Sequence, residues 1–85
     1  MSTMISKIYD VPVAQNWYEI KIEVDRRTAE RWIFVEFKEK FHQKGKREHS
    51  CTDIPLGEAD QTKTLKVTID TDDDGKYTFI LSVSG

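Results

Sequence analysis

The chain has 85 residues, a formal net charge of −2 and one cysteine, Cys51. This length predicts a single domain spanning residues 1–85, and a lone cysteine excludes an intrachain disulfide. The N-terminus lacks the apolar stretch of a signal peptide, and no apolar run reaches the length of a membrane span, so we expect a cytoplasmic protein with no membrane partner.

Two segments near the N-terminus have the pattern of β-strands. The sequence MISKIYDVPV is apolar and β-branched, and Pro12 predicts that this first strand lies at a sheet edge or breaks there. In WYEIKIEVD the apolar residues alternate with charged ones, which is typical of a half-buried antiparallel strand. The residues predicted to face inward are Tyr18, Ile20, Ile22 and Val24.

The segment 28–44 is compatible with two structures. As a helix it would place Ala29, Ile33, Phe34, Phe37 and Phe41 on one broad face. As a strand it would place Ile33, Val35, Phe37 and Phe41 on one face, with Lys38, Lys40 and His42 on the other. The run Trp32-Ile33-Phe34-Val35 consists of strong β-formers and favours the strand.

The C-terminal half adds three short strands. These are EHSCTDI, LKVTID with Leu65, Val67 and Ile69 inward, and KYTFILSV with Tyr77, Phe79, Leu81 and Val83 inward. The whole pattern predicts an all-β fold, a small antiparallel sandwich or partly open barrel of five to six strands. The alternative is an α+β fold, an antiparallel sheet with one helix over residues 28–44.

The segment DDGKYTF resembles the D-x-G-x-Y corner of immunoglobulin-like domains. Asp73, Gly75 and Tyr77 match the motif, Phe79 stands where cysteine would be expected, and Trp32 lies at a suitable distance upstream for the core tryptophan. The resemblance covers about a tenth of the chain and implies a sandwich that serves for binding, with no catalytic residue.

The acidic segment before Gly75 has two interpretations. Asp70, Asp72, Asp74 and Gly75 fill the first positions of an EF-hand calcium loop, but the twelfth position is Leu81 instead of glutamate. A more distant donor for calcium could come only from another loop, with Asp53, Glu58 and Asp60 as candidates. The preferred interpretation is a hairpin turn with a positive φ at Gly75, whose tip, Asp72, Asp73 and Asp74, contacts a partner.

His49, Cys51 and Asp53 alternate along a predicted strand and would share one face. Neighbours on such a face lie about 7 Å apart, too far for one zinc ion or for a nucleophile and its base. We therefore predict no metal site here, no cofactor and no enzymatic activity, and we expect Cys51 to be a buried or half-buried thiol.

The net charge is unevenly distributed, with +3 over residues 37–49 and −4 over residues 50–85. The basic residues of the middle segment, Lys38, Lys40, Lys44, Lys46 and Arg47, predict a partner-binding surface, and nucleic acid is the alternative ligand. By elimination we expect a small protein-binding module, such as a stoichiometric inhibitor or accessory factor, that acts through an edge strand or charged hairpin loops. Self-association is one form of this function.

Overall fold

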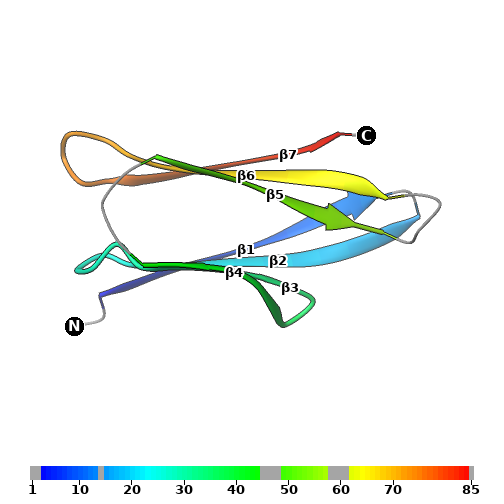
Figure 1. Cartoon of the computed structure of the whole chain (residues 1–85), viewed down its shortest axis with the longest axis horizontal. Helices are drawn as coiled ribbons and strands as arrows, with labels where there is room; N and C mark the ends of the chain where they lie inside the picture. Colours follow the sequence, from blue (N-terminus) through cyan, green and yellow to red (C-terminus); the bar gives the residue numbers. More distant parts are fainter. Residues whose placement is uncertain (1–2, 14, 45–48, 58–61, 85) are drawn as a thin grey trace. The chain divides into compact units, whose positions relative to one another are not determined.

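The structure is a computed structural model that describes residues 3–13, 15–44, 49–57 and 62–84. These residues form seven β-strands and no helix, so the all-β prediction is confirmed and the α+β alternative is wrong (Figure 1). No helix that could span a membrane occurs in these ranges. The chain divides into two units, Met1–Arg47 and Glu48–Gly85, each with its own antiparallel sheet, and the prediction of a single domain stays a prediction.

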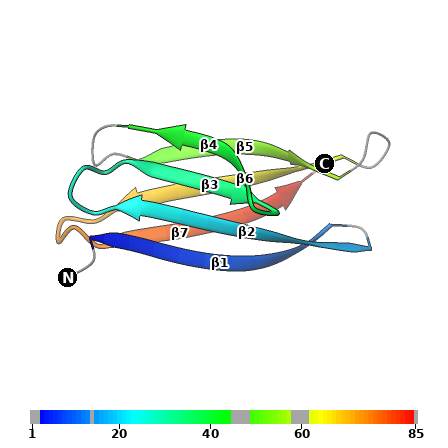
Figure 2. The same ribbon diagram turned by 90° about the horizontal axis from the view of Figure 1, so that it is seen from below.

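The first unit is a four-stranded meander. Its strands are β1 (Met4–Val13), β2 (Asn16–Asp25), β3 (Arg31–Val35) and β4 (Lys38–Gln43). They lie side by side in chain order, and every neighbouring pair is antiparallel (Figure 2). β1 is an edge strand, as Pro12 predicted, since the missing N–H of proline is tolerated where no neighbour needs it.

The second unit is a three-stranded meander. Its strands are β5 (Ser50–Leu56), β6 (Lys63–Thr71) and β7 (Tyr77–Ser84). β6 lies between the other two and pairs antiparallel with both. The predicted turn connects β6 to β7, and Gly75 has the predicted positive φ, 81°.

Alternation along the central strands decides which face of each sheet is buried. In β2, Ile20, Ile22 and Val24 have no exposed surface. In β6, Leu65, Val67 and Ile69 are also fully buried. Burying one such side chain stabilises a fold by about 1.5–3 kcal/mol, so these two strands hold the largest share of the apolar driving force. The inward orientation predicted from the sequence is confirmed for these six residues.

The segment 28–44 is the main departure from the predicted fold. It forms two strands, β3 and β4, instead of one, which raises the number of strands from the predicted five or six to seven. The chain reverses at Glu36 and Phe37, whose φ angles are 49° and 68°. The strand interpretation placed Phe37 on the same face as Ile33 and Val35, yet it sits at the tip of this hairpin and is 81% exposed, whereas those two residues are buried.

A register shift in the same hairpin changes which side chains share a face. Ile33 pairs with Phe41, and Phe34 pairs with Glu39, so Lys40 has no counterpart on β3. An extra residue in one strand reverses the alternation beyond it. Lys38 therefore lies opposite buried Val35 while His42 lies opposite Trp32, and the prediction that Lys38, Lys40 and His42 share one face is wrong.

Candidate functional site: the β3–β4 hairpin

The tip of the β3–β4 hairpin has an unusual backbone. Val35 pairs with Lys38, which leaves Glu36 and Phe37 as a two-residue loop with positive φ at both positions. This is the loop class that normally contains Asn-Gly or Asp-Gly, because a Cβ atom is disfavoured at positive φ. Two residues with large side chains hold this conformation here.

Hydrogen bonds to β2 hold the first of these residues in place. The Glu36 amide donates to the Glu19 carbonyl oxygen at 3.0 Å. In return the Glu19 amide donates to Oε1 of Glu36, also at 3.0 Å. These bonds join the residue next to Phe37 to a strand that lies centrally in the sheet.

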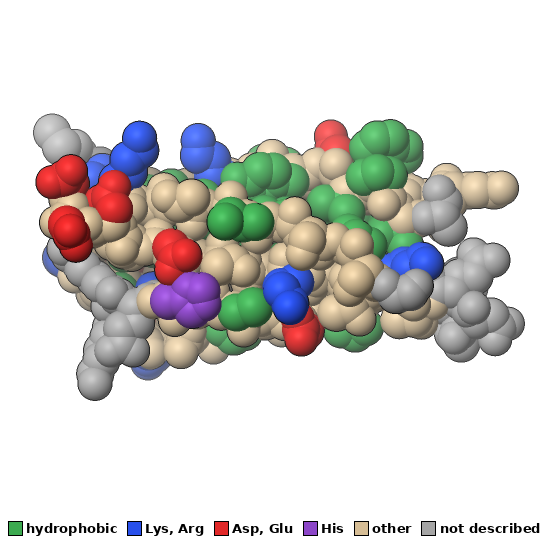
Figure 3. Space-filling model, turned by 90° about the horizontal axis from the view of Figure 1, so that it is seen from above, with side chains coloured by type: hydrophobic (Ala, Val, Ile, Leu, Met, Phe, Trp, Pro, Cys, Tyr) green, Lys and Arg blue, Asp and Glu red, His purple; other side chains and the backbone are tan. Residues whose placement is uncertain are grey.

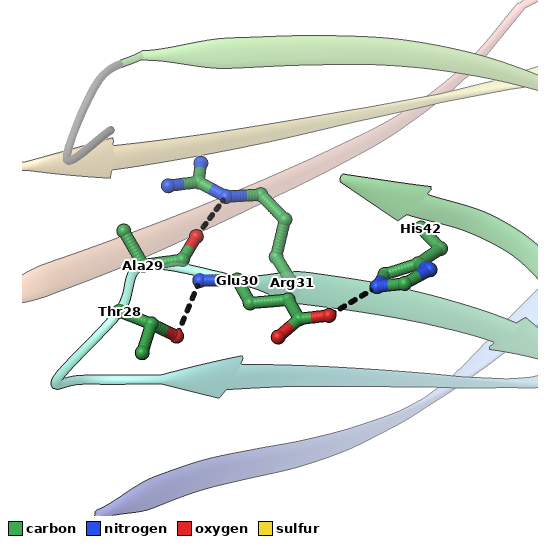
Figure 4. A network of polar contacts seen from close by, with 5 residues as sticks. All are labelled: Thr28, Ala29, Glu30, Arg31 and His42. Atoms are coloured by element: carbon green, nitrogen blue, oxygen red, sulfur yellow. Dashed lines mark hydrogen bonds and ion pairs between the residues drawn. The ribbon is translucent and has the colours of Figure 1, made fainter. Parts of the chain in front are cut away.

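The open end of the hairpin is fixed by His42. Its ring stacks on Trp32 with centroids 5.2 Å apart and planes within 9° of each other. The same imidazole is hydrogen-bonded through Nε2 to the Glu30 carboxylate, just before β3 (Figure 4). On the adjoining strand, the Lys21 ammonium lies 5.8 Å from the centre of the Phe34 ring, which is a cation–π contact. β4 is thereby held to the sheet along its exposed face as well as through its backbone.

The loop before β3 positions Glu30 for this hydrogen bond. Thr28 accepts a hydrogen bond from the Glu30 amide, and the buried Arg31 donates from Nε to the Ala29 carbonyl oxygen (Figure 4). At the start of the loop the Arg27 amide donates to Oδ1 of Asp25 at 2.8 Å. Because this bond favours the charged carboxylate, it lowers the pKa of Asp25 below its ordinary value of 3.8.

The structure describes three of the five basic residues of the middle segment. Lys38, Lys40 and Lys44 are exposed on or just after β4, and the register shift places Lys38 and His42 on opposite faces of the sheet. Lys46 and Arg47 lie outside the described residues. Binding of nucleic acid by segment 38–47 therefore stays a prediction.

The acidic turn is organised around its own backbone. Asp72 Oδ1 accepts hydrogen bonds from the amides of Asp74 and Lys76, at 2.9 and 2.8 Å. Asp70 instead forms a hydrogen bond with His49, with Oδ1 and Nδ1 2.6 Å apart. Asp73 and Asp74 are exposed, and acidic side chains gather at the left-hand end of the face in Figure 3, where this hairpin turns.

This arrangement bears on the calcium alternative. Within the described ranges no group of three His, Cys, Asp or Glu side chains is placed to hold a metal ion. Asp53, one of the possible distant donors, is exposed on β5, while Glu58 and Asp60 lie outside the described residues. The hydrogen bonds of Asp72 instead match the preferred interpretation, a turn stabilised by its own aspartate.

Cys51 differs from its prediction. A buried or half-buried thiol was expected. The side chain is instead exposed, because Cys51 lies on the outward-facing side of β5. The Thr68 hydroxyl donates a weak hydrogen bond to Sγ at 3.8 Å. His49 precedes the strand, and its Nδ1 contacts Oδ1 of Asp70.

The residues of the immunoglobulin-like motif lie in the β6–β7 hairpin, which connects two neighbouring strands of one sheet. The Tyr77 hydroxyl is buried and has no hydrogen-bond partner among the described residues. Trp32 is half-buried on the exposed face of its sheet, opposite the core. Comparison with known protein families, curated proteins and solved structures finds no match for this chain.

Phe37 is the site residue whose position the sequence pattern did not predict. Its neighbours Ile33, Phe34 and Phe41 are apolar, so a core position was the natural expectation. One signal was available: Glu36 interrupts the apolar run of β3, and a polar residue between two apolar segments is compatible with a turn.

Proposed function

We propose that this chain is a protein-binding module that inserts Phe37 into an apolar pocket on another protein. The observation that carries the proposal is the exposure of this phenylalanine, 81%, at the tip of a hairpin whose loop residues both have positive φ. Aromatic side chains are strongly enriched among the residues that dominate the energy of protein interfaces.

The cost of the loop supports a role in binding. A residue other than glycine at positive φ costs about 1–3 kcal/mol, and such strain tends to occur at functional sites. Because the phenylalanine ring is mostly exposed, its burial in the folded chain offsets little of this strain. A binding partner that covers the ring would supply the missing apolar contact.

The rigidity of the hairpin also favours binding. The paired hydrogen bonds between Glu36 and Glu19 fix the tip before any partner arrives, which reduces the entropy lost on association. Lys38, Glu39 and Lys40 are exposed directly after the tip. Together they provide a charged rim around an apolar anchor, the usual composition of a binding surface.

The test compares two variants that each remove one exposed aromatic ring. Phe37→Ala retains the Cβ atom and therefore the backbone strain, while Trp17→Ala removes a ring that is 67% exposed on the same sheet. Each variant and the unmodified chain would be used to capture partners from cells that produce the protein, and the recovered protein would be titrated against all three chains.

We expect the unmodified chain and Trp17→Ala to bind the partner equally well. Phe37→Ala should weaken the affinity by about thirtyfold or more, the effect of removing a central aromatic anchor. Circular dichroism would establish that both variants are folded. Equal binding by Phe37→Ala and the unmodified chain would contradict the proposal.

A further inference from the structure

The four edge strands of the two sheets differ in how they are protected from pairing with another strand. β1 contains Pro12 and β5 contains Pro55, and proline removes a backbone donor. β4 is short, carries Lys38 and Lys40, and has a register shift. These are the features by which natural sheets discourage edge-to-edge pairing.

β7 has none of these features. It contains no charged residue and no proline from Tyr77 to Ser84, and its register with β6 is continuous over its whole length. Within the described part of the chain it pairs with β6 alone. Its outer edge therefore presents an unprotected row of backbone donors and acceptors.

The side chains of β7 also remain unusually exposed. Ile80 and Val83 are 56% and 39% exposed. Tyr77, Phe79 and Leu81 lie on the same face as the buried residues of β6 but are only half-buried. The apolar surface of this sheet thus continues to its edge and would gain cover from one more strand.

We propose that β7 pairs antiparallel with β7 of a second copy of this chain, so that the two three-stranded sheets join into one. The second copy is a suitable occupant because its β7 is itself apolar, uncharged and extended. No side chain along the strand would meet a like charge or bury an unpaired one.

Charge at the adjoining turn determines the orientation. The tip that precedes β7 carries Asp72, Asp73 and Asp74. A parallel pairing would bring the two acidic tips together, and like charges facing each other are destabilising. An antiparallel pairing places the tips at opposite ends of the joint, and it also has the two-fold symmetry that closes a dimer.

The pleat of the strand restricts the register. Residues directly opposite each other project to the same face, so a slip of one residue would set the half-buried face of one copy against the outer face of the other. Centring the two-fold axis on Ile80, midway between Tyr77 and Val83, avoids this and pairs the strands along nearly their whole length. It places Phe79 opposite Leu81 of the partner subunit and Tyr77 opposite Val83 of the partner subunit, and Ile80 faces its own equivalent.

The first experiment measures the mass of the chain by sedimentation equilibrium over a range of concentrations. Ile80→Lys would place two ammonium groups opposite each other at the centre of the joint. Ile8→Lys is the matched control, because Ile8 is 60% exposed and lies on the edge strand of the other sheet. Circular dichroism would verify the fold of both variants.

We expect the unmodified chain and Ile8→Lys to form dimers with the same dissociation constant. Ile80→Lys should weaken dimerisation at least about tenfold. A chain that remains monomeric at every concentration would overturn the inference, as would a dimer that Ile80→Lys leaves unchanged. The hairpin residue Phe37 takes no part in this joint, so its proposed function can fail or hold independently.

Disulfide cross-linking tests the register and does not depend on the lysine variant. With Cys51 replaced by serine, Ile80→Cys should form a covalent dimer when treated with oxidised glutathione. Thr78→Cys and Ser82→Cys should not cross-link alone but should do so when mixed, since residue 78 lies opposite residue 82 of the partner. Cross-linking of Thr78→Cys alone would contradict the proposed register.

Discussion

Phe37 holds a backbone conformation that glycine adopts far more readily, and this allows the strain to be measured. Replacing it by glycine removes the Cβ atom at a φ of 68°, and the lost ring was mostly in solvent. We expect Phe37→Gly to raise the free energy of unfolding by about 1 kcal/mol, the lower part of the range for such strain, since glycine also loses more backbone entropy on folding. Urea denaturation would measure the change.

A decrease in stability of the same size would mean that the Phe37 ring is packed against the fold, in conflict with its exposure. Phe37→Ala is the control, because alanine shares the steric restriction at positive φ. Its stability should differ from that of the unmodified chain by less than about 0.5 kcal/mol, as expected for a surface position. A chain that becomes more stable and binds less well would indicate that the strain serves binding.

Asp25 makes stability depend on pH in a defined direction. The hydrogen bond from the Arg27 amide lowers the pKa of Asp25 in the folded chain below the ordinary value of 3.8. The carboxylate therefore stabilises the fold at pH values above 3.8. This contribution decreases as the pH falls below 3.8 and is lost once the folded-state pKa has been passed. We therefore expect Asp25→Ala to reduce stability at neutral pH and to have a smaller effect in strong acid.

Urea denaturation of Asp25→Ala and the unmodified chain at several pH values would check this dependence. Asp73→Ala, which removes an exposed carboxylate from the other unit, serves as the control for general charge effects. If the free energies of unfolding of Asp25→Ala and the unmodified chain differed by the same amount at every pH, the charge of Asp25 would not be the source of its contribution.

At the scale of the elements, the β6–β7 hairpin depends on one of its aspartates more than on the others. Oδ1 of Asp72 accepts two backbone hydrogen bonds within the turn. Asp72→Ala should lower the free energy of unfolding by about 1 kcal/mol, whereas Asp73→Ala should change it by less than about 0.5 kcal/mol. Thermal or urea denaturation would distinguish the two, and equal effects would contradict the assigned role of Asp72.

The elements differ in how well the sequence predicted them. β2 and β6 followed from strict alternation, because residues such as Ile22 and Val67 have polar neighbours that identify the buried face. The β6–β7 turn followed from Gly75, whose freedom at positive φ marks a reversal. In both cases the local residues favour the structure that the whole sheet requires.

The β3–β4 hairpin was not predictable in the same way. Neither Glu36 nor Phe37 favours positive φ, so the reversal depends on the pairing of the flanking strands and on the bonds to Glu19. The extra residue Lys40 then reversed the alternation of side chains between the two faces along β4. The candidate site lies in this hairpin, so the same two features explain why the sequence did not predict it.

At the scale of the whole molecule, the two sheets share one construction, a central region enclosed by edge strands, but their edges are not equivalent. Three edges carry proline or lysine and one does not. An uncharged edge with exposed apolar side chains favours aggregation unless a defined partner covers it. A two-fold dimer pairs the backbone donors and acceptors of both β7 edges with each other. The assembly then stops at two copies, because neither β7 edge remains open.

Hydrogen exchange can examine this difference across all described strands at once. On an edge strand every second amide points away from the sheet and exchanges quickly, whereas amides of a central strand are bonded on both sides. We expect the alternating pattern in β1, β4 and β5 at every protein concentration. In β7 it should appear only in dilute solution and in Ile80→Lys, because pairing with the second copy protects the outward amides. Rapid exchange of alternate β7 amides in concentrated solution would show that this edge stays open to solvent.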